Sequence, residues 1–155
     1  MSIFNKYPYI VVEGPIGSGK STLAKLLANQ FNAHMFSEKA ERNPFLPKFY
    51  EDMKHFALPT QLFFLFQRAN QINELKQKDF FRSGVISDFF LQKDPIFAKL
   101  NLDNDEYKLY HQIYQHLELK APVPDLVIYL QTPVDLLRYR VEKRNYFTSK
   151  RKIYK

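Results

Sequence analysis

Most of the information about the architecture lies in residues 9–27, which read YIVVEGPIGSGKSTLAKLL. Tyr9–Glu13 is a short apolar, β-branched run of the kind that forms a buried strand. After the glycines, Leu23, Leu26 and Leu27 recur at helical spacing. The segment therefore predicts a strand, a glycine-rich loop and a helix, in that order.

The loop Gly14–Ser21 fits the phosphate-binding pattern G-x-x-x-x-G-K-[ST]. Its glycines let backbone N–H groups turn toward phosphate oxygens, and the following helix presents its positive end to the same anion. We expect Lys20 to reach the β- and γ-phosphates and Ser21 to ligate Mg²⁺. A chance glycine-rich turn is the alternative, but the strand and helix on either side are the context that the motif requires. The predicted nucleotide-binding residues are Gly14, Pro15, Ile16, Gly17, Ser18, Gly19, Lys20, Ser21 and Thr22.

Further strands and helices alternate along the chain. Three more apolar runs are expected as strands: His34–Phe36, Val85–Ser87 and Leu126–Leu130. Three helices are expected: Thr60–Lys78 with Pro59 in its first turn, Asp103–Leu119 with an acidic start, and Pro133–Arg144. This alternation predicts an α/β fold with a parallel sheet of about four strands and helices on both faces. The polar loop Ser37–Pro47 is expected to line a cleft.

Composition limits the class of protein. The 155 residues are 45% hydrophobic and 25% charged, which is typical of one globular domain, here 1–155. The absence of cysteine excludes a disulfide scaffold, a thiol nucleophile and a cysteine zinc site. No apolar run approaches the roughly 20 residues of a membrane span, and the N-terminus lacks a signal-peptide pattern. We therefore expect a cytoplasmic protein with no membrane association.

The net charge of +7 is concentrated at one end of the chain. Residues 138–155 hold eight of the 23 basic residues and one acidic residue, Glu142, whereas the rest of the chain is neutral. Such a patch can bind nucleic acid or the phosphates of a nucleotide.

The reaction must be inferred from the remaining motifs, because switch GTPases, motor ATPases and small-molecule kinases share the loop. These motifs are Glu38 with Asn43-Pro44-Phe45-Leu46, Tyr50-Glu51-Asp52, Gln61 with Arg68, Asp88 with Asp94-Pro95, and Asp125–Leu130. With them, the sequence from about Tyr9 to about Arg144 resembles the deoxynucleoside kinase family, most closely its bacterial deoxyadenosine/deoxyguanosine kinases. The resemblance implies a P-loop NTPase-like three-layer sandwich, five-stranded in the family. It also implies ATP- and Mg²⁺-dependent phosphorylation of the 5′-hydroxyl of a deoxynucleoside, a purine one, in nucleotide salvage.

The resemblance assigns roles on the substrate side. Glu38 is implied as the general base, and Asn43-Pro44-Phe45-Leu46 favours it over the rival Glu41. Tyr50 is implied as the ligand of the sugar 3′-hydroxyl, although a tyrosine packed at a helix end is the alternative.

The nucleobase is implied to bind Gln61, together with Arg68 and Asp94. Gln61 and Arg68 are seven residues apart, so they share one helix face. The residues between them, Leu62–Phe66, are all apolar, which indicates a buried helix whose polar groups need partners. Phe64 and Phe97 are candidates for stacking on the base, with core packing as the alternative.

Asp88 is expected at the carboxyl end of a strand, where it could hold substrate, or Mg²⁺ together with Ser21. The family has an arginine and a serine after this acid, whereas this chain has Phe89 and Phe90. Positive charge on the phosphate side must therefore come from elsewhere, or activity is reduced.

Arg140 and Arg144 are four residues apart on a predicted helix and match the arginines of the family's lid over the triphosphate. After Arg144 nothing resembles the family, whose members continue through further elements. A truncated, weakly active or inactive nucleotide-binding relative is therefore the alternative to a working kinase.

Other hypotheses stay open at this stage. A nucleoside monophosphate kinase would need basic residues for a substrate phosphate, and only Arg42 and Arg68 are candidates. A nucleic-acid-binding module is disfavoured because the basic end lacks a motif for reading bases. The resemblance implies a homodimer, for which the helices Thr60–Lys78 and Asp103–Leu119 would supply the surface.

Overall fold

The computed structural model describes residues 3–77, 83–118 and 121–153. Its centre is a four-stranded sheet in the order β2-β3-β1-β4, and every pairing is parallel. The strands are β1 (Tyr9–Glu13), β2 (His34–Phe36), β3 (Val85–Ser87) and β4 (Leu126–Tyr129). All four coincide with the strands predicted from sequence, except that β4 ends one residue before Leu130.

Within the described ranges, six α-helices connect or follow the strands. They are α1 (Lys20–Phe31), α2 (Leu46–Glu51), α3 (Met53–Gln77), α4 (Asp94–Asn101), α5 (Asn104–Glu118) and α6 (Val134–Ile153). Short 3₁₀ turns occupy η1 (Ile3–Asn5), η2 (Ala40–Arg42) and η4 (Leu91–Lys93).

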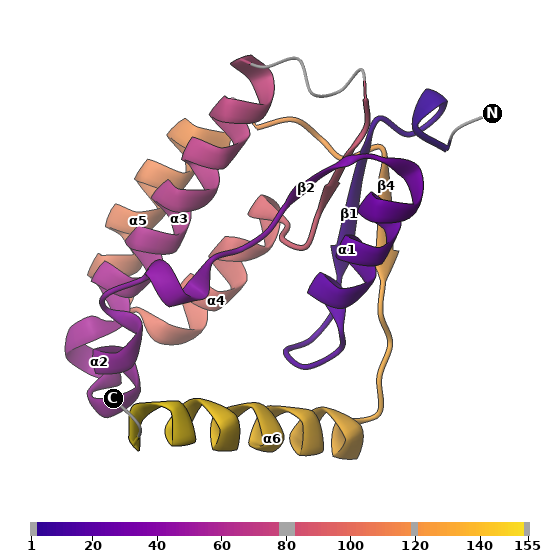
Figure 1. Cartoon of the computed structure of the whole chain (residues 1–155). Helices are drawn as coiled ribbons and strands as arrows, with labels where there is room; N and C mark the ends of the chain where they lie inside the picture. The colour runs from indigo at the N-terminus through magenta and orange to yellow at the C-terminus, as the bar shows by residue number, and fades with distance from the viewer. Residues whose placement is uncertain (1–2, 78–82, 119–120, 154–155) are drawn as a thin grey trace.

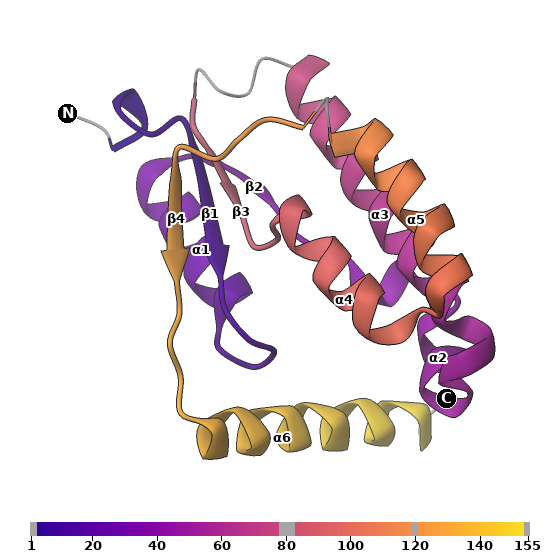
Figure 2. The same ribbon diagram turned by 180° about the vertical axis from the view of Figure 1, so that it is seen from behind.

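The sheet is covered on both faces because successive residues of a strand point to opposite sides. Ile10 and Val12 pack with Ala24 and Ala28 of α1, whereas Val11 packs with Leu75 of α3 on the other face. Figures 1 and 2 show α1 on one side of the strands and α3 on the other. The predicted three-layer α/β sandwich is therefore confirmed.

A second apolar core joins the helices beyond the sheet. Leu65 and Ile72 of α3 pack with Ala98 of α4 and with Tyr110 and Tyr114 of α5. These side chains are spaced at helical intervals within α3 and α5, so each helix buries one face against the other. This core fixes α4, whose first residue is Asp94, beside α3.

Helix α6 crosses the end of the molecule at which the strands finish (Figure 1). It leads away from β4, passes the loop that follows β1 and ends near α2, as the reverse view in Figure 2 also shows. No helix among residues 3–77, 83–118 and 121–153 is long and apolar enough to cross a membrane.

The structure corrects the predicted boundaries of two helices. The helix predicted to start at Thr60 begins at Met53 and contains Pro59 in its interior. A proline there removes one helical hydrogen bond, but burial of Ala57 and Thr60 on either side holds the segment in helical form. The helix predicted to end at Arg144 continues to Ile153.

Helices α2 and α4 were not expected from the sequence. Both have proline in their first turn, which reads equally well as a loop. The predicted helix ends Lys78 and Leu119 lie outside the described residues, as do Lys155 and the neighbouring Tyr154 of the basic end.

Candidate active site

The loop between β1 and α1 has the backbone of a phosphate cradle. Gly17 and Gly19 have φ of +82° and +98°, in the left-handed region that favours glycine. A Cβ at Gly14 would lie 2.7 Å from the Ser18 hydroxyl oxygen and 2.9 Å from the Leu130 carbonyl oxygen. No side chain caps the N-terminus of α1 at Gly19, so its first N–H groups face the loop rather than a capping oxygen.

Lys20 turns back into this loop. Its Nζ donates to the carbonyl oxygens of Gly14, at 2.9 Å, and Pro15, at 3.0 Å. Burial lowers the pKa of Lys20, and the nearby Glu13 carboxylate offsets part of that effect. The lysine is therefore held inside the loop, where an anionic ligand would favour its charged form.

Two further residues at the loop were not singled out by sequence reasoning. Glu13, the last residue of β1, accepts hydrogen bonds from the Gly14 N–H at 2.7 Å and from Lys93 Nζ at 2.6 Å. Lys93 precedes α4 and is 80 residues away in the chain. No local sequence signal pointed to this pair, because only folding brings Lys93 beside Glu13.

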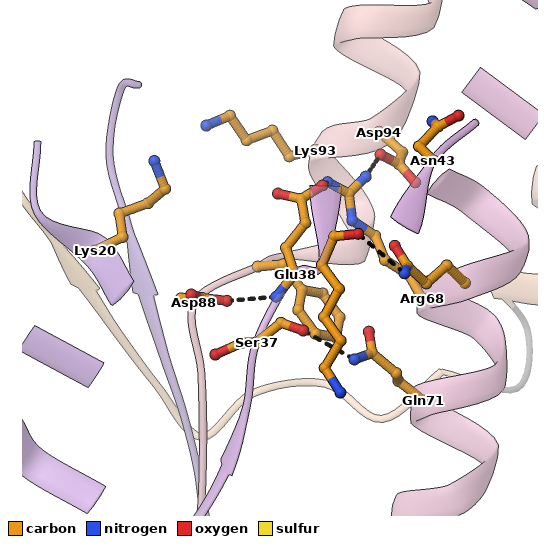
Figure 3. Close-up of polar contacts among 12 residues, drawn as sticks. Lys20, Ser37, Glu38, Asn43, Arg68, Gln71, Asp88, Lys93 and Asp94 are labelled. Atoms are coloured by element: carbon orange, nitrogen blue, oxygen red, sulfur yellow. Dashed lines mark hydrogen bonds and ion pairs between the residues drawn. The ribbon is translucent and has the colours of Figure 1, made fainter. Parts of the chain in front are cut away.

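Arg68 connects Glu38, the predicted general base, to Asp94, which is predicted to bind the nucleobase (Figure 3). Its guanidinium forms ion pairs with Glu38 and with Asp94, and the side chains of the three are 12%, 29% and 2% exposed, respectively. The rings of Phe64 and Phe89 lie 5.6 and 6.0 Å from the guanidinium carbon. Phe64 therefore contacts Arg68 in this structure, and the buried Phe89 helps to fix the same side chain.

Asp88 follows β3 directly and connects it to the segment after β2. Its Oδ1 accepts a hydrogen bond from the Glu38 N–H at 2.8 Å, as Figure 3 shows. The carboxyl ends of β1, β3 and β2 thus place the phosphate loop, Asp88 and Glu38 along one edge of the sheet. Ligands bind at this edge in doubly wound sheets.

Glutamine and asparagine side chains attach the segment after β2 to α3. Gln71 Nε2 donates to the Ser37 carbonyl at 2.9 Å and Gln67 Nε2 to the Lys39 carbonyl at 3.2 Å. Asn43 Nδ2 donates to the Thr60 carbonyl at 3.1 Å. These bonds fix Glu38 between two anchored neighbours, a role that local sequence patterns did not reveal.

The segment also lines a cavity, as predicted for Ser37–Pro47. The cavity has a volume of about 450 Å³ and is bounded by Ser37, Lys39 and Arg42 on one side and by Gln67 and Gln71 of α3 on the other. Glu38 and Arg68 are not among the residues that line this cavity, so it lies beside the cluster of Glu38, Arg68 and Asp94.

Three candidate residues have different surroundings. Gln61 is buried in α3, two turns before Arg68. Tyr50 in α2 is 71% exposed, with its ring 5.7 Å from that of Phe49, and no contact among the described residues joins it to Glu38 or Arg68. Glu41, the rival of Glu38, is exposed in η2.

Helix α6 contacts the phosphate loop from the side opposite the sheet. Arg140 Nη1 donates to the carbonyl oxygens of Gly17, at 3.2 Å, and Ser18, at 3.3 Å. A Cβ at Gly17 would lie 3.2 Å from Val141 Cγ2, which shows how closely helix and loop approach. Arg144 lies one turn further along α6 and is exposed.

The residues present fit a magnesium nucleotide. The Ser18 hydroxyl is buried with no hydrogen-bond partner among the described residues, which leaves a polar group inside the loop for a ligand. In the described part of the chain, no three acidic, histidine or cysteine side chains gather as a metal cage. Mg²⁺ in nucleotide enzymes is usually held by one or two carboxylates with phosphate oxygens, which suits Asp88 with the Ser21 hydroxyl.

Comparison with known proteins agrees with this geometry. The family model for deoxynucleoside kinases matches residues 10–154. The expectation that the resemblance ends at about Arg144 was therefore wrong, since the match continues ten residues further. A deoxyguanosine kinase of Bacillus subtilis is 37% identical over 90% of this chain and 68% of its own length. A deoxyadenosine kinase of Lactobacillus acidophilus is 33% identical over 87% of this chain and 66% of its own length. The chain thus spans about two thirds of these relatives.

Solved structures show the same likeness. The deoxyadenosine kinase of M. mycoides with bound dATP superposes with a TM-score of 0.75 at 30% identity, over 88% of this chain and 71% of that one. The same kinase with bound dCTP gives a TM-score of 0.73 at 30% identity, over 87% of this chain and 69% of that one. From fold, site and sequence together, this chain belongs to the deoxynucleoside kinase family, whose members are phosphotransferases.

Proposed function

We propose that this chain transfers the γ-phosphoryl group of ATP to the 5′-hydroxyl of a purine deoxynucleoside. The observation that supports this most directly is the arrangement along one sheet edge of a phosphate loop, a carboxylate and an arginine–aspartate pair. The relatives named for deoxyguanosine and deoxyadenosine favour a purine acceptor.

In this proposal Glu38 accepts the proton of the 5′-hydroxyl as the oxygen attacks the γ-phosphorus. The new O–P bond forms while the bond from that phosphorus to the β-phosphate oxygen breaks, and ADP leaves. Lys20, Arg140 and Arg144 neutralise the charge of the phosphoryl group during transfer. Ser21 and Asp88 would hold Mg²⁺, which would supply further charge neutralisation.

The deoxynucleoside is proposed to lie against α3. Arg68 Nε and Asp94 Oδ2 are buried and have no hydrogen-bond partner among the described residues, so both atoms can bind the edge of a base. Gln61, on the same helix, would add a bidentate donor and acceptor. Tyr50 would have to turn from its exposed position to reach the sugar 3′-hydroxyl.

The proposal is tested by phosphoryl transfer from MgATP to each of the four deoxynucleosides. We expect turnover with a purine deoxynucleoside and a loss of about 100-fold or more in Glu38→Gln, because general-base catalysis contributes about that much. Glu41→Gln is the matched control and should keep wild-type activity. Wild-type activity in Glu38→Gln would assign the base elsewhere.

A second candidate function is nucleotide binding without turnover. The phenylalanine at position 89, where the family has an arginine, favours it. Folded wild-type protein that binds MgATP but phosphorylates none of the four deoxynucleosides would establish this alternative.

We propose further that residues 1–155 form one domain that pairs with a second copy through α3 and α5. Phe66 of α3 and Leu109 of α5 are exposed apolar side chains on these helices. Sedimentation of the wild type and of Leu109→Glu measures this directly, with a dimer expected in the first and a monomer in the second.

A further inference from the structure

Lys93 occupies an electrostatically unfavourable position. It is the residue that precedes the first turn of α4, at the positive end of that helix dipole. Its ammonium group nevertheless lies inward, with a side chain only 28% exposed. A cation held against a helix dipole and partly removed from water indicates that an anion compensates it there.

The ammonium group of Lys93 lies at the start of the phosphate loop. Lys93 Nζ is 2.6 Å from Glu13 Oε1 and 3.4 Å from the Gly14 carbonyl oxygen. Lys20 Nζ is 2.9 Å from that same carbonyl oxygen. Two ammonium groups therefore converge on one backbone oxygen, and Lys93 is among the charges that lower the pKa of Lys20, after burial.

Figure 3 places Lys93 between Lys20 and the pair formed by Arg68 and Asp94. The phosphoryl group must cross this interval if it passes from the loop to a hydroxyl beside Glu38. Arg68 is already paired with two carboxylates. Position 89, directly after Asp88, holds a buried phenylalanine and offers no charge. Lys93 thus adds a cation beside Lys20 on the path of the transferred group.

We propose that Lys93 is a second phosphate-binding lysine, whose ammonium group contacts the γ-phosphate of the bound donor. This inference rests on the function proposed above and names a residue for it. Glu13 holds the ammonium group beside the loop. When the triphosphate is bound, the γ-phosphate oxygens share that group with Glu13 and its charge stabilises the phosphoryl group during transfer.

The first test compares the binding of MgATP and AMP by calorimetry in Lys93→Gln, Lys93→Arg and Lys99→Gln. Lys99 is an exposed lysine on the same helix and serves as the matched control. We expect Lys93→Gln to weaken MgATP binding about 10- to 100-fold, as the loss of a charge-assisted hydrogen bond does, and to leave AMP binding unchanged. Lys93→Arg should retain most of the affinity and Lys99→Gln all of it.

A purely structural role of Lys93 as the counter-ion of Glu13 predicts a different outcome. Glu13→Gln keeps an acceptor for the Gly14 N–H but removes the same ion pair. If Lys93 acts on phosphate, Glu13→Gln retains MgATP binding while Lys93→Gln loses it. If both variants weaken MgATP and AMP alike, the role is structural and the inference is wrong.

Turnover separates this inference from the proposed function. A wild type that phosphorylates deoxynucleosides, with Lys93→Gln unchanged in MgATP affinity and in kcat, overturns the role of Lys93 alone. A wild type that binds MgATP without turnover, with binding weakened in Lys93→Gln, supports the phosphate contact and overturns the kinase. A wild type that binds no MgATP overturns both.

Discussion

Single charged side chains determine how this site is built. Arg68 is nearly buried and would be costly to desolvate alone, but Glu38 and Asp94 bind it from two sides and two aromatic rings flank it. The three charges are mutually dependent, because each loses its compensation if another is removed. The contribution of each ion pair to stability therefore depends on the other pair being present.

Removal of Asp94 should therefore destabilise the fold. Asp94 is 2% exposed, so Asp94→Ala leaves a buried guanidinium with half of its counter-charge, at a cost of about 3 kcal/mol or more. Urea unfolding followed by circular dichroism measures this loss. Asp105→Ala, which breaks an exposed pair with Lys108, is the control and should change stability little. Similar small losses in both variants would show that the buried pair adds no stability.

At the scale of elements, the sequence predicts what is determined locally. All four strands and the phosphate loop follow from short apolar runs and glycine spacing, which need no distant partner. The predicted start of α3 at Thr60 was wrong. Burial of the residues beside Pro59 outweighs the tendency of proline to begin a helix. The Arg68–Asp94 pair could be foreseen from a resemblance, whereas Glu13 and Lys93 are brought together only by folding.

The contact between α6 and the phosphate loop can be tested with two glycines. Gly17→Ala and Gly19→Ala impose similar backbone strain, of order 1 kcal/mol, since both positions have positive φ. A Cβ at Gly17 also meets Val141 and the Leu137 carbonyl, but a Cβ at Gly19 meets nothing within 4 Å. We expect faster amide hydrogen exchange in residues 134–144 of Gly17→Ala alone. Equal exchange in both variants would contradict this packing.

At the scale of the whole molecule, charge and burial act on stability differently. Neutral pH lies well below the isoelectric point of about 9.5, so the chain carries a net charge of +7 there. Two buried tyrosines, Tyr9 and Tyr110, stay neutral in the folded state because burial raises the pKa of each phenol. Stability at high pH should therefore depend on these two side chains.

The pKa of Tyr9 defines the pH range over which stability should fall. Burial raises its pKa to about 12, and a hydrogen bond with Ser87 opposes part of that shift. The folded value exceeds the unfolded value of 10.0, so the contribution is complete below pH 10 and is lost as pH rises toward 12. Unfolding free energy should fall by about 2 kcal/mol over that range, and less in Tyr9→Phe. The exposed Tyr50→Phe is the control, and an unchanged decline in Tyr9→Phe would contradict the assignment.

The shared guanidinium of Arg68 has a consequence for substrate selection. The proposed proton acceptor, Glu38, and the proposed base-reading carboxylate, Asp94, draw on one cation, so a base that disturbs Asp94 also changes how Glu38 is held. A mismatched nucleoside would then be penalised at the moment of proton transfer, not only when it binds. Under the proposed function, discrimination between deoxynucleosides should be visible in kcat as well as in KM.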